Sequence, residues 1–300
     1  MLNGIKKLRH ICLGTRGSEL ALRQTNIVCV AIQTAEPNCK VEVKIIKTKG
    51  DTDQSPIPLD TIGKGWFTKE IEKELLNGSI DAAVHSLKDM PELLPPNLHI
   101  SSYPEREDPR DVLISRENKM LKELHSGAIV GTDSIRRKVQ ILALRTDLVV
   151  ESLRGNVLKR LEKLDAGDYD AVVLAAAGIK RLNIEDRISQ YFTTAEIMPA
   201  PGQGILAIET RKDNDELNVL MQKISNKEAV CAAMAERTFA HTIGGGCKTP
   251  VGACAHIEND KLILEGMFSN NDEDIKYASI SGSLDNAKKL GEQLAKKLLQ

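Results

Sequence analysis

The sequence has few aromatic residues, almost no net charge and no long apolar segment. Aromatic side chains make up 3% of the 300 residues, too few for the stacking platforms that bind bases. The 41 basic and 42 acidic residues leave a net charge of −1, so no global field draws the chain to nucleic acid or to an anionic membrane. No apolar run is long enough to cross a bilayer. We therefore expect neither nucleic acid nor a membrane as a partner.

Signals for secretion and for metal binding are also lacking. The first ten residues are mixed and basic, without the apolar stretch of a signal peptide, which predicts a cytoplasmic protein. The six cysteines are scattered without the spacing of a disulfide framework, which favours reduced thiols. His241, Cys247 and Cys254 are not accompanied by Cys-x-x-Cys or paired-histidine spacing, so we expect no metal site.

Apolar runs alternate with amphipathic stretches, a pattern typical of α/β proteins. A first series has predicted strands at 11–15, 41–48 and 80–84, with helices at 18–35 and 69–76. A second series starts near Asp111 and has strands at 128–131, 148–152 and 171–175, with helices at 134–144 and 157–164. A strand at 205–209 is expected to return to the first series. Beyond Asn226, one helix, three strands (250–257, 261–267, 275–281) and a final helix from Leu284 predict a smaller α+β domain.

Two breakpoints, at 105–110 and 199–204, suggest three domains. We predict domain 1 at 1–104 and 200–222, domain 2 at 105–199 and domain 3 at 223–300. The predicted fold class is α/β, with two βα domains forming a cleft as in periplasmic binding proteins, plus the small α+β domain. The two series echo each other: each has Gly-Thr at a strand end and a serine, Ser18 or Ser134, at a helix start. A serine there caps free amides, which with the helix dipole attract anions.

A cysteine stands on a bare loop in the third domain. Cys247 follows three glycines and precedes Lys-Thr-Pro, so little side-chain bulk surrounds its sulfur. One interpretation is a flexible loop with an incidental cysteine; the other is a thiol presented for covalent chemistry.

Arginines concentrate in one part of the chain. Ten of the 15 arginines lie between Arg106 and Arg187, where only six lysines occur. Arginine binds carboxylates through a planar two-pronged donor that lysine cannot imitate. Arginines near strand ends (Arg16, Arg136, Arg137 and Arg154) stand where open α/β sheets bind ligands. We expect a ligand rich in carboxylates or phosphates.

Two further loops are candidates for chemistry. His-Ser-Leu-Lys-Asp-Met-Pro at 85–91 follows an apolar strand and places Asp89 beside Lys88. This pair is either an ordinary loop ion pair or a carboxylate that handles protons and steadies a developing positive charge. Gly-Lys-Gly-Trp-Phe at 63–67 is either a lid or a simply packed loop.

Together these segments resemble the porphobilinogen deaminase (hydroxymethylbilane synthase) family from about Leu13 to Ala255. The matching motifs are Gly-Thr-Arg-Gly-Ser-Glu-Leu-Ala-Leu at 14–22, Thr-Lys-Gly-Asp at 48–51, Gly-Lys-Gly-Trp-Phe-Thr-Lys-Glu at 63–70, Ala-Val-His-Ser-Leu-Lys-Asp-Met-Pro at 83–91, Arg-Glu-Asp-Pro-Arg-Asp at 106–111, Gly-Thr-Asp-Ser-Ile-Arg-Arg at 131–137, Ser-Leu-Arg-Gly-Asn-Val at 152–157, Pro-Ala-Pro-Gly-Gln-Gly at 199–204 and the Gly-Gly-Cys loop.

The resemblance implies a three-domain, monomeric, cytoplasmic transferase of tetrapyrrole (haem) biosynthesis. Such an enzyme condenses four molecules of porphobilinogen head to tail, releasing ammonia, into hydroxymethylbilane, which passes to uroporphyrinogen-III synthase. It also implies one dipyrromethane cofactor per chain, attached by a thioether to Cys247. Each pyrrole carries an acetate and a propionate, which would account for the arginines.

The resemblance further assigns roles to individual residues. Asp89 matches the catalytic carboxylate. Residues expected to bind the cofactor are Cys247, Ser86, Lys88, Asp89, Thr132, Ser134, Arg136, Arg137 and Arg154. Residues expected to bind substrate are Arg16, Ser18, Arg154, Arg160 and Arg181. Lys64, Phe67 and Gln203 match lid and hinge positions.

One residue departs from the family pattern. Asp133 places an acid inside the Gly-Thr-x-Ser-x-Arg-Arg motif, where a small polar residue is typical. Its carboxylate either repels the substrate or pairs with an arginine.

Two other classes of function are compatible with parts of the sequence. A non-catalytic anion-binding protein would use the arginines but not the thiol. A cysteine hydrolase would pair Cys247 with His241 or His85 but would not need the arginines.

Overall fold

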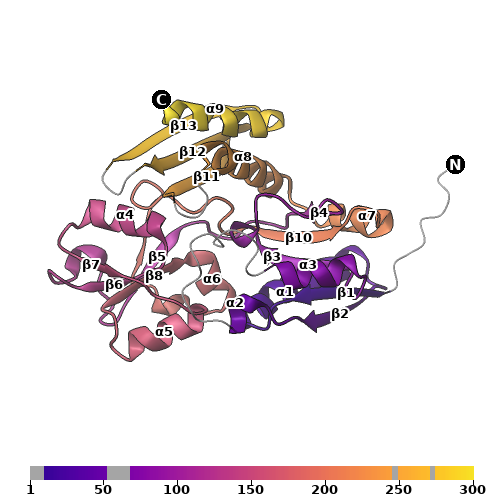
Figure 1. Cartoon of the computed structure of the whole chain (residues 1–300), viewed down its shortest axis with the longest axis horizontal. Coiled ribbons are helices and arrows are strands. Elements are labelled where there is room, and N and C mark those ends of the chain that lie inside the picture. Colours follow the sequence, from indigo (N-terminus) through magenta and orange to yellow (C-terminus); the bar gives the residue numbers. More distant parts are fainter. Residues whose placement is uncertain (1–9, 53–67, 245–248, 271–273) are drawn as a thin grey trace. The chain divides into compact units, whose positions relative to one another are not determined.

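The computed structural model describes residues 10–52, 68–244, 249–270 and 274–300, which form two compact units. One unit contains the chain up to Arg106 and the segment Ile205–Val230; the other contains Glu107–Gly204 and Cys231–Gln300. Sheets covered by helices are present in both units (Figure 1), which confirms the predicted α/β class. The division into three domains stays a prediction.

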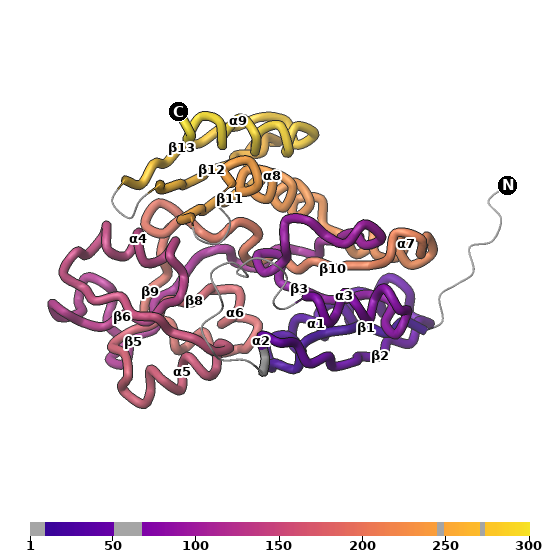
Figure 2. The backbone as a smooth tube through the Cα atoms, in the orientation of Figure 1, coloured from indigo at the N-terminus to yellow at the C-terminus, as the bar shows by residue number. Residues whose placement is uncertain are grey.

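The first unit is built around a five-stranded sheet of order β2-β1-β3-β10-β4. Its strands are β1 (His10–Thr15), β2 (Lys40–Ile45), β3 (Ala82–Ser86), β4 (Leu98–Ser102) and β10 (Leu206–Arg211). Its helices are α1 (Glu19–Ala35), α2 (Lys49–Thr52), α3 (Lys69–Leu76) and α7 (Asp215–Lys223). β1 is parallel to β2 and β3, whereas β10 is antiparallel to β3 and β4. The predicted return of the chain to this sheet through β10 is therefore confirmed, and the tube in Figure 2 follows it.

Helices cover both faces of this sheet. Alternate residues of a strand point to opposite sides, and β1 has apolar side chains on both, so each face needs a helix to bury it. Ile11 and Leu13 of β1 pack with α1 and α7 in one apolar cluster. Cys12, between them, packs with α3 on the other face, beside Ile71 and Leu75. A sheet buried on both faces has its ligand-accessible atoms at its edges and strand ends, which is where the candidate site lies.

The second unit contains another five-stranded sheet, of order β7-β6-β8-β5-β9. Its strands are β5 (Asp111–Ser115), β6 (Ile129–Gly131), β7 (Val149–Glu151), β8 (Ala171–Ala175) and β9 (Gln190–Tyr191). Its helices are α4 (Ile135–Leu144), α5 (Val157–Asp165) and α6 (Ala176–Arg181). β6 is parallel to β7 and β8, and β5 is antiparallel to β8. α4 packs on one face and α5 with α6 on the other.

A three-stranded antiparallel sheet of order β11-β12-β13 lies in the same unit. It consists of β11 (Val251–Glu258), β12 (Lys261–Ser269) and β13 (Ile275–Gly282), with helices α8 (Lys227–Ile243) and α9 (Ala287–Leu299). α9 packs tightly on α8, since a Cβ at Gly291 would lie 2.5 Å from the carbonyl oxygen of Ala235. This part has the helix, three strands and helix that the sequence predicts.

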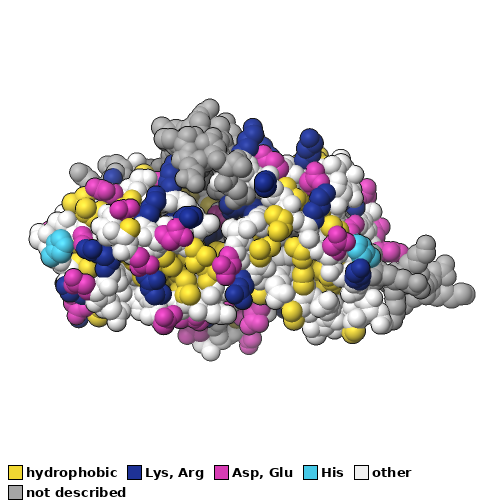
Figure 3. Space-filling view, turned by 90° about the horizontal axis from the view of Figure 1, so that it is seen from below, with side chains coloured by type: hydrophobic (Ala, Val, Ile, Leu, Met, Phe, Trp, Pro, Cys, Tyr) yellow, Lys and Arg dark blue, Asp and Glu magenta, His cyan; other side chains and the backbone are white. Residues whose placement is uncertain are grey.

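Acidic and basic side chains are interspersed on the face drawn in Figure 3, in keeping with the net charge of −1. No helix among the described residues is both long and apolar enough to span a bilayer.

Candidate functional site

In the first unit, candidate residues gather where β1 and β3 end. These strands are parallel neighbours, so their carboxyl ends share one edge of the sheet. β1 leads into Arg16 and then into Ser18, whose hydroxyl accepts a hydrogen bond from the Ala21 amide (3.3 Å) and caps α1. The side chains of Arg16 and Ser18 are both partly exposed. This strand end therefore presents a cation beside a capped helix start.

β3 ends at Ser86 and leads into a single 3-10 turn, Leu87–Asp89. The Leu87 amide donates to the Ile205 carbonyl (3.0 Å) and the Met90 amide to the Leu87 carbonyl (3.1 Å), which fix both ends of the turn. Lys88 and Asp89 are exposed on it. The structure thus places the Lys-Asp pair on an anchored turn.

The two strand ends are tied together by side chains. Gln24 of α1 donates from Nε2 to the hydroxyl of Ser86, at 3.0 Å. This bond links the helix that Ser18 caps to the start of the Asp89 turn. Arg16, Ser18, Ser86 and Asp89 consequently belong to the same edge of one sheet.

A buried acid–histidine pair lies one residue before Ser86. His85 Nε2 is 3.1 Å from Glu209 Oε2, and the two side chains are 5% and 0% exposed. Burial, together with the nearby charge of Glu209, raises the pKa of Glu72, a third buried member of the group. Glu209 Oε1 is buried without a hydrogen-bond partner in the described part of the chain. No local sequence pattern points to Glu72 or Glu209. The pairing with Glu209 makes His85 a buried structural partner rather than an exposed base.

In the second unit, candidate residues lie at the carboxyl ends of the parallel strands β6 and β7. Thr132 and Ser134 follow β6, and Ser134 Oγ accepts from the Arg137 amide (3.4 Å) to cap α4. Arg154 follows β7, and Arg160 on α5 donates from Nε to the Gly155 carbonyl (2.8 Å). The structure brings these predicted residues to one edge of the second sheet.

Arg136 and Arg137 are held in a buried network that the sequence did not suggest. Asp111 Oδ2 accepts from Arg136 Nη1 (2.7 Å), and Asp111 Oδ1 accepts from Arg137 Nη2 (2.6 Å). Each arginine also reaches a backbone carbonyl: Arg136 that of Met198 (2.5 Å) and Arg137 that of Val173 (2.9 Å). Both guanidinium groups therefore have protein partners, and their role at a cofactor stays a prediction.

Charge balance in this network favours the ionised carboxylate. Burial by itself would raise the pKa of Asp111, but the two guanidinium groups outweigh it and hold that pKa well below its usual range. Gln203 joins the network through Nε2, which donates to Asp111 Oδ1 (2.9 Å) and to the Pro109 carbonyl (2.7 Å). The residue predicted at a hinge is thus bonded to the carboxylate that orients both arginines.

Arg181 lies on α6, beside this segment. Its Nη2 donates to the Gly204 carbonyl at 2.7 Å, and burial lowers the pKa of its guanidinium to about 10. Cys247, Lys64 and Phe67 lie outside the described residues. Among the last residues described before the cysteine loop is Gly244, whose φ of 74° is in the region that favours glycine.

Asp133 is paired, which confirms one of its two interpretations. Its Oδ2 lies 3.3 Å from Arg154 Nε, and its Oδ1 accepts from Ser152 Oγ at 2.6 Å. Asp133 and Arg154 are 36% and 32% exposed.

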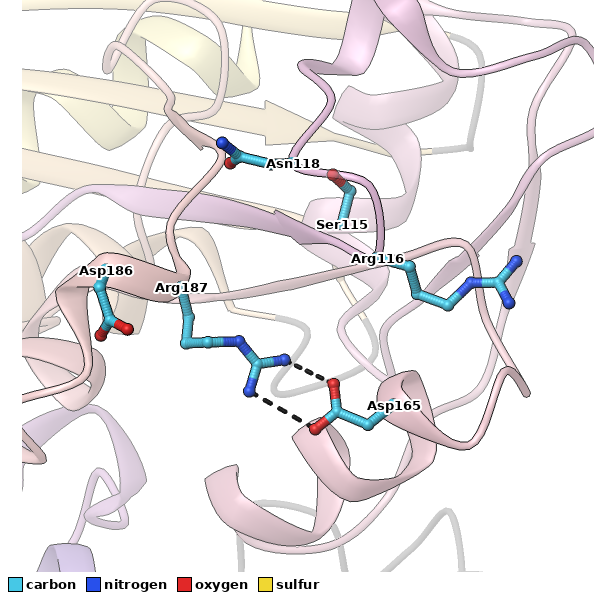
Figure 4. Close-up of a pocket in the computed structure, with 6 residues that line it drawn as sticks. All are labelled: Ser115, Arg116, Asn118, Asp165, Asp186 and Arg187. Carbon is cyan, nitrogen blue, oxygen red and sulfur yellow. Dashed lines mark hydrogen bonds and ion pairs between the residues drawn. The ribbon is translucent and has the colours of Figure 1, made fainter.

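A shallow pocket elsewhere in the second unit is not part of this site. It is lined by Ser115, Arg116, Asn118, Asp165, Asp186 and Arg187 (Figure 4). β5 is antiparallel to β8, and Ser115 pairs with Ala171, so the pocket lies at the opposite edge of the sheet from Thr132. Arg187 is already paired with Asp165 (2.6 Å) and Arg116 with Asp170 (2.9 Å). Its cations are therefore neutralised by the chain itself.

Fold and site together define an α/β protein with cations and capped helix starts at the ends of parallel strands, an arrangement suited to anionic ligands. Known proteins with similar sequences identify the family within this class. Residues 11–219 match the family model described as "Porphobilinogen deaminase, dipyromethane cofactor binding domain", and residues 230–300 match the C-terminal domain of the same family. The chain belongs to the porphobilinogen deaminase family.

Curated relatives are similar in sequence to this chain over nearly its whole length. The porphobilinogen deaminases of Syntrophomonas wolfei and Thermus thermophilus are each 45% identical over 295 residues, covering 98% of this chain and 96% of theirs. That of a Roseiflexus species is 46% identical over 290 residues, covering 96% and 95%. Among solved structures, the methionine-binding protein MetQ is 14% identical with a TM-score of 0.43, over 76% of this chain and 91% of that one. A TM-score this low supports no further argument.

Proposed function

We infer that the protein condenses four molecules of porphobilinogen head to tail into hydroxymethylbilane. The observation that carries this inference is the family match, because both family domains and relatives at about 45% identity span nearly the full chain. In each condensation the aminomethyl C–N bond of porphobilinogen breaks and ammonia leaves. A C–C bond then forms to the free α carbon of the preceding pyrrole, which loses a proton. Hydrolysis of the C–C bond between the first unit and its primer would release the finished chain, with water supplying a hydroxyl group to the methylene carbon and a proton to the pyrrole carbon that it leaves.

We propose that Asp89 is the catalytic carboxylate of this reaction. Its position supports the proposal, since it is exposed on an anchored turn at the strand ends, beside Lys88 and at the same sheet edge as Arg16. A carboxylate there accepts hydrogen bonds from pyrrole N–H groups and stabilises the positive charge that develops as ammonia departs. Arg16, Arg154, Arg160 and Arg181 bind the acetate and propionate groups of substrate and growing chain.

The described residues fit a dipyrromethane cofactor. Its four carboxylates need cationic and hydroxyl partners, and residues of these types lie at the carboxyl ends of strands in each unit: the partly exposed Ser86 and the exposed Lys88 in the first, and the partly exposed Ser134 and Arg154 in the second. When bound, the cofactor supplies the terminal pyrrole to which the first substrate is joined. We propose that it is held by a thioether to Cys247, one per chain, with Asp111 fixing the orientation of Arg136 and Arg137 around it.

Intact mass under denaturing conditions tests the proposal. The purified chain should carry an adduct of two pyrroles, and Cys247→Ser should lack it. Cys254→Ala is the matched control, because Cys254 is only seven residues away but buried in β11. An unmodified wild-type chain that cannot be loaded with porphobilinogen, or an adduct on another cysteine, would refute the assignment. The anion-binding and cysteine-hydrolase alternatives both predict the unmodified chain.

A cytoplasmic location, a monomeric state and transfer of the product to uroporphyrinogen-III synthase belong to the same proposal. They follow from the family resemblance alone.

A further inference from the structure

The carboxylate of Asp133 occupies a group of side chains that could bind the carboxylate of a ligand. Its two oxygens contact different partners, Arg154 Nε at 3.3 Å and Ser152 Oγ at 2.6 Å. It also directly precedes Ser134, the N-cap of α4, where the helix dipole favours a negative charge. A cation, a hydroxyl and a helix start are the partners that a pyrrole acetate or propionate would require.

The surrounding backbone fixes this arrangement. β6 ends at Gly131, where a Cβ would lie 2.8 Å from the ring of Tyr169 and 2.9 Å from Leu153. Tyr169 in turn donates from its hydroxyl to the Ser152 carbonyl at 2.7 Å. The ends of β6 and β7 are thereby held at a set separation, and Asp133 and Arg154 with them.

The pair is nevertheless open to exchange. Both side chains are about one-third exposed, so a ligand carboxylate can reach Arg154 from solvent. Ion pairs of this exposure are weak, because water and salt screen them. By contrast, the guanidinium groups of Arg136 and Arg137 pair with Asp111, which is fully buried. Arg154 therefore differs from those two in having a counter-ion that an incoming anion can displace.

We propose that Asp133 is a specificity-determining residue that acts as an internal competitor, occupying Arg154 until a pyrrole carboxylate replaces it. The inference rests on the proposed function of Arg154. Its consequence is that the chain binds porphobilinogen less tightly than the same site would without the acid. The competition also favours ligands with several carboxylates over ligands with one. A ligand with a single carboxylate gains less binding free energy from displacing Asp133 than a ligand that contacts further cations at the same time.

The test compares Asp133→Asn with wild type in the loaded enzyme. Asparagine keeps the size and a hydrogen bond to Ser152 but removes the charge. We expect KM for porphobilinogen to fall about two- to fivefold with kcat unchanged, equivalent to about 0.4 to 1 kcal/mol at 1.4 kcal/mol per tenfold. The same variant should take up the pyrrole adduct faster when the apoprotein is mixed with porphobilinogen, as followed by intact mass. Both effects should shrink at high salt, which already screens the pair.

The matched control is Asp147→Asn. Asp147 is 38% exposed and pairs with Arg145 at 2.7 Å, at a position away from these strand ends, so this variant makes the same charge change without touching Arg154. An unchanged or raised KM in Asp133→Asn would overturn the proposal, the raised value meaning that Asp133 orients Arg154 rather than competes for it.

Arg154→Gln separates this inference from the proposed function. If Arg154 binds carboxylates, the variant loads poorly or has a raised KM, and adding Asp133→Asn to it should then change nothing. If Arg154→Gln loads and turns over normally, the assigned role of Arg154 fails. If Arg154→Gln is impaired but Asp133→Asn behaves as the control does, only the competition fails.

Discussion

Replacing Asp111 by asparagine should destabilise the second unit strongly. The carboxylate is fully buried and accepts hydrogen bonds from Arg136, Arg137 and Gln203. Asparagine has nearly the same volume, so no cavity forms, but two buried guanidinium groups lose their only described acidic partner. The change therefore isolates the charge of one side chain.

The expected loss in the free energy of unfolding arises because the variant leaves the buried charges of Arg136 and Arg137 without a counter-ion. Removing one partner of a buried ion pair costs about 3 to 5 kcal/mol. For a unit of this size, 1 kcal/mol moves Tm by about 2 to 4 °C, which corresponds to a loss of roughly 6 to 20 °C. A protein with two compact units need not unfold in one step, so scanning calorimetry, which resolves separate transitions, is the appropriate assay.

Asp165→Asn is the control for this prediction. Asp165 pairs with Arg187 at 2.6 Å but is 56% exposed, and an exposed pair contributes little. We expect Asp165→Asn to shift Tm only slightly. Equal shifts in the two variants would refute the reasoning, because they would mean that the Asp111 network does not support the fold.

The pH dependence gives an independent check. Because the pKa of Asp111 is lower in the folded chain than in the unfolded one, the carboxylate contributes stability that is fully present above its unfolded pKa of about 3.9 and is lost as pH falls toward the folded value. The Tm difference between wild type and Asp111→Asn should be constant near neutrality and narrow below about pH 4. A difference that stays constant down to pH 3 would contradict the assigned charge.

Three further predictions concern other parts of the molecule. Asp89→Ala should lower kcat by a factor on the order of 100 to 1,000 with little change in KM, as measured by steady-state kinetics; a near-normal kcat would make Asp89 a simple loop residue. Glu72→Gln should raise Tm at pH 7 but not at pH 4, because the raised pKa of Glu72 means that ionising it in the folded state costs stability above its unfolded pKa; an equal Tm difference at both pH values would contradict this. Gly291→Ala should lower stability by about 1 to 3 kcal/mol in urea unfolding, because the added Cβ meets the backbone of α8; a stabilised variant would show that helix propensity outweighs this contact.

The strands and helices of both series could be predicted because their apolar periodicity is strong. β3 differs from its prediction, since the apolar pattern predicts a strand at 80–84 and the structure has it at Ala82–Ser86. The polar side chains of His85 and Ser86 suggested a loop. These two residues extend the strand because their backbone pairs with Ala207 and Leu206 of β10, and the buried His85 ring has Glu209 of the same strand, 124 residues away, as its partner. The sequence patterns do not predict β4, β5, β9, α2, α6 or α7.

The candidate site also contains residues that local sequence predicts and residues that it does not. Local patterns predict Ser18 and Ser134 at helix starts that follow strands, and the structure places both there as N-caps. Asp111 ends the motif at 106–111, yet nothing in the neighbouring sequence indicates that it lies against two arginines of α4. Its role depends on β5 and α4 lying together in the folded unit, and no spacing along the chain encodes that.

The arginines of the second unit differ in how the chain itself pairs them. A cluster of guanidinium groups in a folded protein needs counter-ions before any ligand arrives, and this chain supplies them from its own carboxylates. Asp111 is fully buried, so its ion pairs with Arg136 and Arg137 are shielded from water and costly to break. Asp133 is exposed, so its hold on Arg154 is weak and open to exchange. We therefore expect burial of the counter-ion, rather than the number of arginines, to decide which cations a growing chain of carboxylated pyrroles can bind.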